Sequence, residues 1–302
     1  MPADNRIGYL FPAGGPVPRE LMIGREAALD ELNRRISEGM HTMLTGERRI
    51  GKTTVCDAAC DLLSEAGSVV IRIEAPEDVD ATALLQLVVD RTRRRDPAVV
   101  GRRLFKAAEP LVEGFLREQG IPLDLSQLDR GSPPDAARKI LALPLRIAEE
   151  EGRRVVFYFD ELQRVVDYEG GERLLGDLVD LYSGQAGVVL LVDGSSERAL
   201  DRMMGRPVGF GKLVGRLALA EEIPALAWRA QLPERFREAG LRVEPEALEE
   251  LVSFGAGRPY ATMAAARYSA LNARKLGSPA VGAFEVREGI EEARRHISED
   301  RP

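Results

Sequence analysis

Apolar and polar positions form two different patterns along the first two thirds of the chain: helical periodicity and short apolar runs. Apolar residues recur at helical spacing from Arg25 to Glu38, where Gly39 ends the predicted helix, and again from Lys52 to Gly67. Short apolar runs lie between and after these segments and are typical of strands. The predicted strands are His41–Thr45, Ser68–Ile73, Val155–Phe159, Val188–Val192 and, as a fifth candidate, Leu217–Ile223.

Alternating strands and helices predict an α/β fold. The runs Val155–Phe159 and Val188–Val192 are apolar throughout, as expected of strands covered on both faces of a parallel sheet. A leucine-rich helix around residues 174–181 separates them, and residues 79–151 contain helical patterns only. This order predicts right-handed crossovers and helices on both faces of the sheet.

The pattern changes after Pro224, where strand-like runs disappear. Residues 1–20 are rich in Gly and Pro and are interpreted as an extended lead-in, residues 21–223 as the α/β core, and residues 224–302 as a smaller all-helical domain. The helices predicted in this last part are Leu226–Glu238, Pro245–Phe254, Pro259–Leu276 and Phe284–Ile297.

Composition narrows the class of protein. The 302 residues are 44% hydrophobic and 30% charged, which indicates a soluble globular chain of more than one domain. No uncharged apolar run approaches the roughly 18 residues of a membrane span, and the first residues lack the pattern of a signal peptide. Two cysteines cannot form a disulfide framework, so a cytoplasmic protein without membrane contact is expected. The net charge of −7 argues against a broadly basic, nucleic-acid-coating surface, while a local basic patch stays open.

The segment GERRIGKT matches the pattern G-x-x-x-x-G-K-[ST] in full. Its glycines let the backbone turn so that successive N–H groups face phosphate oxygens, and the helix that begins at Lys52 adds the positive end of its dipole. Lys52 is expected on the β and γ phosphates and the Thr53 hydroxyl on Mg²⁺. A chance glycine-rich turn is the less favoured interpretation, because the segment joins a predicted strand to an amphipathic helix. The binding residues predicted here are Gly46, Glu47, Arg48, Arg49, Ile50, Gly51, Lys52, Thr53 and Thr54.

An acidic pair, Asp160 and Glu161, directly follows the apolar run Val155–Phe159. An acid at the end of a buried strand is costly unless it serves a cation or a partner. Asp160 is predicted to hold Mg²⁺ through its water shell, which is the Walker-B role, and Glu161 to be the general base for the attacking water. Two solvated acids at the end of a strand are the alternative.

Polar residues also follow the run Val188–Val192. Ligands of open α/β sheets bind at the carboxyl ends of the strands, so Ser195 or Ser196 could orient water or sense the γ-phosphate. A plain loop is the alternative.

Taken together, these residues resemble the AAA+ superfamily, especially the prokaryotic ATPases related to the origin-recognition and STAND groups. The resemblance runs from about Leu21 to Ala266 and implies a three-layer P-loop NTPase fold of the ASCE/AAA+ type with a C-terminal helical lid. The segments that carry it are Met22–Glu26, the P-loop with Arg48 and Arg49, Asp160 and Glu161 with Gln163, Gly194–Ser196, Leu213–Arg216 and Gly257–Tyr260.

The resemblance assigns binding roles outside the P-loop. It implies that Ile23 and Arg25 lie beside the adenine, which favours ATP and ADP over guanine nucleotides. It implies that the lid contacts the nucleotide through Arg258 and Pro259, with either Arg258 or Tyr260 in the sensor-2 position.

An arginine finger is also implied, because in this family an arginine after the fourth strand often reaches the γ-phosphate of a neighbouring subunit. Arg216 is the first candidate, followed by Arg206 and Arg202. A surface arginine without this role is the alternative.

Two further groups of residues attract interest. Cys56 and Cys60 lie four apart on one predicted helix and are interpreted as packing residues, not as metal ligands. A basic stretch could contact nucleic-acid phosphates or an acidic partner, although solvated helix ends have the same composition. This stretch comprises Arg91, Thr92, Arg93, Arg94, Arg95, Arg102, Arg103 and Lys106.

The sequence therefore predicts an ATPase that binds ATP or ADP with Mg²⁺ and couples the nucleotide state to rearrangement of the lid or of subunit contacts. Its predicted catalytic residues are Lys52, Glu161, Ser195 and Arg216. Self-association through the finger and an unidentified protein or nucleic-acid partner are expected. Two alternatives stay open: a nucleotide-dependent regulatory switch with little turnover, and a DNA-associated regulator of replication or transposition.

Overall fold

The computed structural model describes residues 3–77, 81–95, 133–194 and 196–299. Contacts between Cα atoms divide the chain into two compact units. The helical unit consists of Met1–Asp30, Gly46–Ala58 and Leu219–Pro302, and the sheet unit consists of Glu31–Thr45 and Ala59–Ala218. The division differs from a simple boundary near Pro224, because the N-terminal residues and the P-loop group with the C-terminal helices.

The sheet unit is built on five parallel strands in the order β2-β3-β4-β1-β5. Their bounds are β1 Thr42–Thr45, β2 Val69–Glu74, β3 Val155–Asp160, β4 Val188–Asp193 and β5 Gly215–Ala218. The first four agree with the sequence prediction. The fifth begins and ends earlier than Leu217–Ile223, because the chain from Leu219 onward belongs to the helical unit, where Ile223 joins the core.

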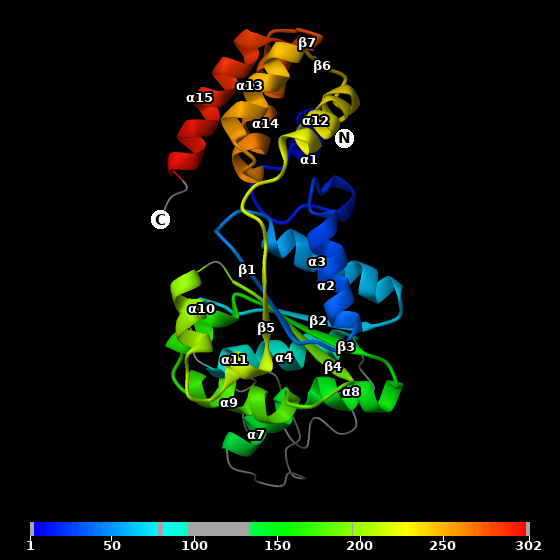
Figure 1. The fold of residues 1–302 in the computed structure, drawn as a ribbon, viewed down its shortest axis with the longest axis vertical. Coiled ribbons are helices and arrows are strands. Elements are labelled where there is room, and N and C mark those ends of the chain that lie inside the picture. The colour runs from blue at the N-terminus through cyan, green and yellow to red at the C-terminus, as the bar shows by residue number, and fades with distance from the viewer. Residues whose placement is uncertain (1–2, 78–80, 96–132, 195, 300–302) are drawn as a thin grey trace, which may run out of the picture. The chain divides into compact units, whose positions relative to one another are not determined.

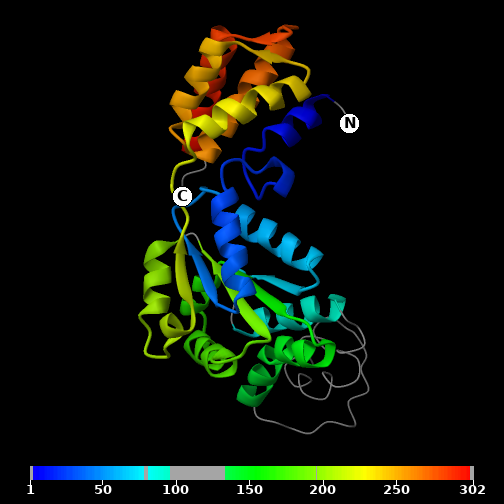
Figure 2. The same cartoon turned by 45° about the vertical axis from the view of Figure 1, so that its right-hand side comes forward.

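Helices cover both faces of this sheet, which confirms the three-layer α/β architecture (Figures 1 and 2). One face lies against α2 (Glu26–Ser37) and α3 (Lys52–Glu65). The other face carries the alternate residues Phe157 and Phe159 of β3, which pack into a fully buried core. The helices whose residues join that core or pack against it are α4 (Ala81–Arg95), α7 (Pro133–Leu141), α8 (Leu143–Glu151), α9 (Gly171–Tyr182), α10 (Glu197–Met204) and α11 (Phe210–Leu213).

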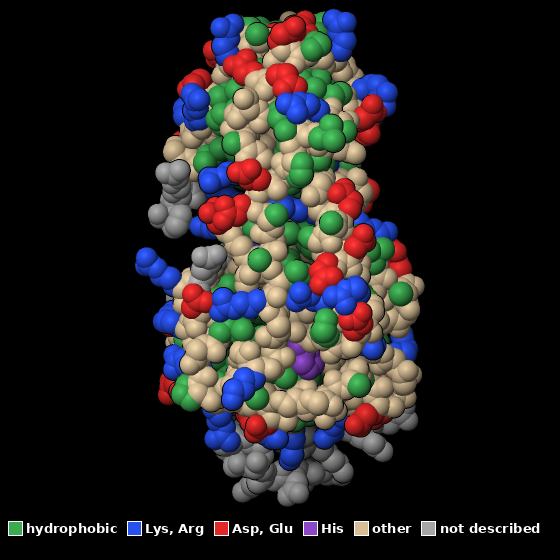
Figure 3. Space-filling view, viewed as in Figure 1, with side chains coloured by type: hydrophobic (Ala, Val, Ile, Leu, Met, Phe, Trp, Pro, Cys, Tyr) green, Lys and Arg blue, Asp and Glu red, His purple; other side chains and the backbone are tan. Residues whose placement is uncertain are grey.

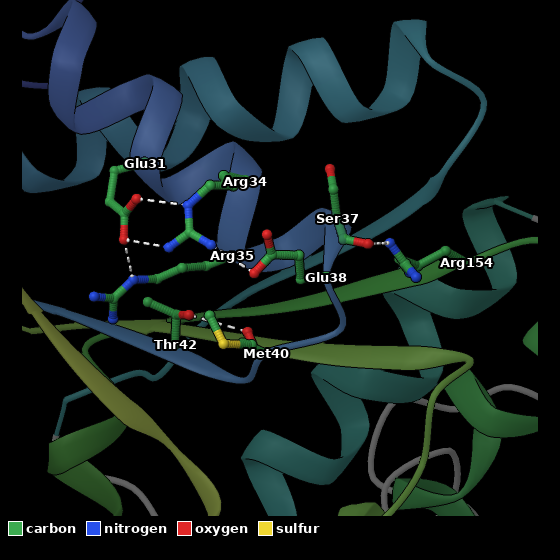
Figure 4. A network of polar contacts seen from close by, with 8 residues as sticks. All are labelled: Glu31, Arg34, Arg35, Ser37, Glu38, Met40, Thr42 and Arg154. Atoms are coloured by element: carbon green, nitrogen blue, oxygen red, sulfur yellow. Dashed lines mark hydrogen bonds and ion pairs between the residues drawn. The ribbon is translucent and has the colours of Figure 1, made fainter.

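Ion pairs organise the last turns of α2 within the sheet unit (Figure 4). Glu31 accepts hydrogen bonds from Arg34 and from Arg35, which hold the pKa of Glu31 at about 2. Arg154, the residue before β3, donates to the carbonyl oxygens of Ile36 at 3.1 Å and Ser37 at 2.5 Å. The cation at the C-terminal end of α2 also complements the negative end of the helix dipole. This network fastens the end of α2 to the start of β3.

The helical unit contains the four helices predicted after Pro224. They are α12 (Ala225–Glu238), α13 (Pro245–Gly255), α14 (Pro259–Lys275) and α15 (Ala283–Glu299). Two short strands, β6 (Arg242–Val243) and β7 (Ala280–Val281), pair in parallel between them. The helical C-terminal region is confirmed. The strand pair was not predicted, because strands of two residues leave no recognisable pattern in the sequence.

The expectation that residues 1–20 form an extended lead-in is wrong in part. Ala3–Leu10 form helix α1, which packs on α14, and Arg19–Leu21 form the 3₁₀ turn η1. Ile7, Leu10 and Phe11 are buried in the same core as Trp228 and the C-terminal helices. Tertiary burial therefore stabilises a helix too short to be stable alone.

A buried arginine joins these N-terminal residues to α12. Arg235 donates hydrogen bonds to the carbonyl oxygen of Leu10, at 2.8 Å, and to that of Leu21. Burial lowers the pKa of Arg235 to about 10, so the guanidinium stays charged at neutral pH. The charge is satisfied by charge-assisted hydrogen bonds to these two backbone oxygens.

The structure also answers two simpler questions. Cys56 and Cys60 are buried on α3 and form no disulfide, as expected of packing residues. Within the described ranges no helix is both long and apolar enough to cross a membrane.

Candidate functional site

The P-loop begins where β1 ends, since Gly46 follows Thr45 in the chain. Its backbone takes positive φ at Gly46 (148°), Arg49 (67°) and Gly51 (97°). A Cβ atom on Gly46 would lie 2.4 Å from Cδ1 of Ile50, so only glycine fits there. At Gly51 no atom lies within 4 Å of the corresponding position. The space beside Gly46 is therefore filled by Ile50, whereas the space beside Gly51 is open.

Lys52 lies at the start of α3 with its ammonium inside this loop. Its Nζ donates to the carbonyl oxygens of Gly46, at 2.8 Å, and Glu47, at 2.7 Å, and the side chain is buried. The next residue, Thr53, carries its hydroxyl in the first turn of the helix. Thr54 accepts a hydrogen bond from the backbone N–H of Val17 at 3.2 Å, so its side chain secures the N-terminal segment. Of the remaining loop side chains, those of Glu47 and Arg48 are exposed and that of Ile50 is buried.

Arg25 braces the P-loop from the N-terminal side. Its guanidinium donates to the carbonyl oxygens of Ile50, at 2.9 Å, and Ala220, at 2.6 Å, and burial lowers its pKa. Ile23 is buried in the core of the helical unit. A Cβ on Gly24 would lie 2.5 Å from Cγ2 of Ile223. The predicted adenine-side segment therefore packs tightly against the residues around Ile223. The guanidinium of Arg25 points to the P-loop, where it bonds the carbonyl oxygen of Ile50, and not to solvent.

The segment Gly257–Tyr260 joins the same part of the helical unit. The backbone N–H of Ile223 donates to the carbonyl oxygen of Gly257 at 2.8 Å. Arg258 precedes α14 with an exposed side chain, and Pro259 is the first residue of that helix. Tyr260 follows, and the guanidinium carbon of Arg49 lies 4.5 Å from the centre of its ring. Of the two sensor-2 candidates, Tyr260 is the one in contact with the P-loop.

Backbone strain is concentrated in these motifs. The described residues include three non-glycine residues with positive φ: Arg49 in the P-loop, Glu161 after β3 and Ala256 before Gly257. Each such residue costs on the order of 1 kcal/mol, and such positions cluster at functional sites. All three lie in or beside segments that the sequence assigns to the nucleotide.

Acidic residues line the carboxyl end of the sheet. Asp160 at the end of β3 is in register with Glu74 of β2 and with Asp193 of β4. Leu44 of β1 is in turn opposite Asp193. The carboxyl end of the sheet, where β1 also ends, therefore carries Asp160 and Asp193.

Glu161 is held by neighbours on two segments. Its backbone N–H donates to the carbonyl oxygen of Asp193 at 3.0 Å, and its carboxylate accepts a hydrogen bond from Nε2 of Gln163. Gln163 is buried and lies against Gly194, where an added Cβ would come within 2.0 Å of Oε1. Gly194 thus leaves the space in which Gln163 orients the predicted general base.

Arg72 is a residue of the candidate site that was not predicted from the sequence. Its Nη2 lies 3.1 Å from Oδ2 of Asp160, and its guanidinium carbon lies 5.3 Å from the centre of the Tyr158 ring. The signal was present in the sequence, because Arg72 is the one charged residue within the run SVVIRI. A lone charge in a strand predicts a partner on a neighbouring strand.

Each candidate for the arginine finger pairs with an acid of its own chain. Arg216 on β5 donates to Asp201 at 2.6 Å. Arg202 and Arg206 form ion pairs with Asp167, at 3.1 Å, and with Glu172, at 3.6 Å. The side chains are largely exposed, so these pairs exchange readily with solvent or with another anion.

Some predicted residues lie outside the described part of the chain. Ser195 is one of them, and so are Arg102, Arg103 and Lys106 of the basic stretch. Arg91 and Thr92 of that stretch lie on α4.

The donor set fits a nucleotide with magnesium. The P-loop offers an ammonium, a helix N-terminus and an open position at Gly51, which suits phosphate oxygens. Among the described residues no three His, Cys, Asp or Glu side chains gather into a metal site. Magnesium in nucleotide sites takes one or two protein ligands and completes its shell with phosphate oxygens and water, so a hydroxyl such as that of Thr53 and one carboxylate suffice.

Comparisons with solved structures agree with this architecture. A Walker-type ATPase of Pyrococcus abyssi is 20% identical with a TM-score of 0.65, over 96% of this chain and 78% of that one. The ORC2 protein of Aeropyrum pernix is 19% identical with a TM-score of 0.61, over 97% and 74%. Cdc6p of Pyrobaculum aerophilum is 15% identical with a TM-score of 0.59, over 98% and 74%. At these identities the likeness shows the fold.

No curated protein sequence matches the chain. The family described as an AAA domain matches residues 34–202. The match begins in α2, and it includes the P-loop, both acidic strand ends and the start of the segment that carries the finger candidates. Because it covers more than half of the 302 residues, the chain belongs to this AAA domain family of P-loop ATPases.

Proposed function

We propose that the chain binds ATP with Mg²⁺ and hydrolyses ATP to ADP and phosphate. The observation that carries the proposal is the P-loop, whose backbone takes positive φ at Gly46, Arg49 and Gly51 and whose interior holds the ammonium of Lys52. An ammonium that rests on two carbonyl oxygens can move to phosphate oxygens, which are stronger acceptors. The family is one of nucleotide-dependent ATPases, in agreement with this assignment.

Each residue of the proposed site has a separate task. Lys52 and the backbone N–H groups of the loop neutralise the β and γ phosphates. Thr53 and Asp160 hold the magnesium, which supplies charge neutralisation at the transferred phosphoryl group. Glu161 accepts the proton of the attacking water, and Gln163 keeps its carboxylate in place. Arg25 keeps the loop closed through the carbonyl oxygen of Ile50.

The decisive test separates binding from turnover. We expect Lys52→Ala to lose nucleotide binding, and Glu161→Gln to bind ATP as the natural chain does while its steady-state hydrolysis falls at least about a hundredfold. Glu169→Gln is the matched control, because Glu169 is an exposed acid on the same loop region. Unchanged turnover in Glu161→Gln contradicts its role as the base. Unchanged binding in Lys52→Ala contradicts the phosphate site.

A nucleotide-held switch with little turnover is the second candidate. It is favoured by the finger candidates, since Arg216, Arg202 and Arg206 each pair with an acid of their own chain. Without a neighbouring subunit to receive it, the arginine stays in its own exposed pair and the chain hydrolyses slowly. Because such pairs exchange readily, a neighbouring subunit can take the arginine. Nucleotide retained through purification, together with negligible turnover at all protein concentrations, supports the switch.

We propose a second copy of the chain or another protein as the partner. One of the similar structures, the ORC1 protein of Aeropyrum pernix, was solved in complex with DNA. Here the net charge is −7, and acidic and basic side chains are interspersed on the visible face of the C-terminal helices (Figure 3). Light scattering after size exclusion, with ATP, with ADP, without nucleotide and with duplex DNA, distinguishes these partners. A DNA complex that survives physiological salt contradicts the preference for a protein partner.

A further inference from the structure

Arg49 and Tyr260 form a contact that none of the roles above uses. The guanidinium carbon of Arg49 lies 4.5 Å from the centre of the Tyr260 ring, well inside the range of a cation–π interaction. Arg49 sits at the tip of the P-loop with φ of 67°, a conformation that a residue with a side chain adopts only when its surroundings hold it there. Tyr260 is the second residue of α14, directly after Pro259.

The ring of Tyr260 is itself supported from α15. Its centre lies 6.1 Å from that of the His296 ring, and His296 also packs edge-on against Tyr268 at 6.0 Å. Tyr260 and Tyr268 lie eight residues apart on α14, so they occupy the same side of that helix. A continuous row of rings thus runs from the P-loop to the C-terminal helix.

In this contact the P-loop supplies the cation, Arg49, and α14 supplies the aromatic ring, Tyr260. Arg258 lies two residues before Tyr260, but its side chain is exposed. The helix therefore offers an aromatic face to the loop, and the loop supplies the cation. Arg49, which contacts α14, is part of the predicted phosphate-binding segment, so its conformation bears on how that segment receives a phosphate.

We infer that Tyr260 is a positioning residue for the P-loop, which holds Arg49 and keeps the loop in its phosphate-binding form. The inference rests on the proposed nucleotide binding. A loop that is already held needs less ordering when the nucleotide arrives, so Tyr260 raises affinity for ADP and ATP. Because the ring belongs to α14 and is backed by α15, it also links occupancy of the loop to the packing of these helices.

The test compares two tyrosines of the same helix. Tyr260→Leu is expected to weaken ADP binding about three- to tenfold by calorimetry. Tyr260→Phe keeps the aromatic face and is expected to retain full affinity. Tyr268→Leu also removes a ring from His296, yet it does not touch Arg49, so its ADP affinity is expected to be unchanged.

A double-mutant cycle identifies the partner. Arg49→Ala is expected to weaken ADP binding, and adding Tyr260→Leu to it is expected to cause no further loss. Equal affinity of Tyr260→Leu and the natural chain overturns the inference and leaves the proposed function standing. An equal loss in Tyr268→Leu also overturns it, because the effect then comes from helix packing. Absence of ADP binding to the natural chain overturns both.

Discussion

The guanidinium of Arg72 on β2 donates a hydrogen bond to the carboxylate of Asp160 at the end of β3, with 3.1 Å between Nη2 and Oδ2. Asp160 is buried, whereas the Arg72 side chain is 39% exposed. The carboxylate assigned to magnesium is therefore balanced by a cation within the sheet unit, and its charge is tolerated before any metal arrives.

Removal of this cation is expected to destabilise the fold. Arg72→Met leaves a buried carboxylate without its charged donor and is expected to lower the free energy of unfolding by about 1–3 kcal/mol. Adding Asp160→Asn is expected to recover part of the loss, because no charge then remains to be balanced. Urea denaturation at neutral pH measures both. Arg229→Met is the control: its partner Glu249 is exposed, so a loss below about 0.5 kcal/mol is expected. Equal losses at the two positions contradict the argument.

Gly194 is expected to control catalysis through Gln163. In Gly194→Ala the new methyl group would displace the Gln163 amide, which then no longer orients Glu161. We expect kcat to fall about tenfold with little change in ATP affinity. Gln163→Ala should show the same loss, and the double variant should lose no more than either single one. Additive losses would mean that the two residues act on different steps.

Stability is expected to fall in mild acid because of His41. Its Nδ1 accepts a hydrogen bond from the N–H of Leu190 at 2.9 Å and its Nε2 lies 3.1 Å from the carbonyl oxygen of Tyr182, so the half-buried ring is neutral. Burial lowers the pKa of His41 below its ordinary value of 6.5. The unfolded chain therefore takes up a proton first, and stability is present above about pH 6.5 and is lost as pH falls toward the folded-state pKa.

The check is the slope of unfolding free energy between about pH 7.5 and about pH 5.5. His41→Gln cannot be protonated, so it should be less stable than the natural chain at the upper pH yet show a flatter slope. His296→Gln makes the same substitution at the other histidine of the sequence and is the matched variant. A natural slope in His41→Gln would assign the acid sensitivity to other groups.

Arg216 is expected to act on a neighbouring subunit. Arg216→Ala should lower ATP turnover at least about tenfold and remove any rise of specific activity with protein concentration. Mixing it with Lys52→Ala should restore turnover, since the second chain binds no ATP but supplies Arg216. Arg229→Ala, which removes an exposed arginine of the helical unit, should behave as the natural chain does. Failure of the mixture to recover activity would exclude action in trans.

Local patterns were sufficient for most of the fold. The P-loop, four strands and the four C-terminal helices depend on neighbours in the sequence, and they were predicted within a few residues of their observed bounds. The limits of β5 could not be predicted, because they depend on where the chain passes from the sheet unit to the helical unit, which is after Ala218. Helix α1 was missed since its stability comes from burial against α14.

The residues of the candidate site also differ in whether local sequence or the folded structure reveals them. Asp160 and Glu161 were visible because an acidic pair after an apolar run is informative by itself. Arg72 depends on the register of β2 against β3, which places it within reach of Asp160 only in the folded sheet. Arg25 was assigned to the nucleotide, and the structure adds that its guanidinium bonds two backbone oxygens, one of them almost two hundred residues away.

The core that contains Ile7, Leu10 and Phe11 also contains Val286 and Ile290. During synthesis this core cannot close until α15 has emerged from the ribosome, whereas every described residue of the sheet core precedes Gly215. The P-loop is contacted by Arg25 and by Tyr260 of α14. The newly made chain therefore gains its sheet before its phosphate loop is held, and nucleotide capture has to wait until α14 and α15 have been made.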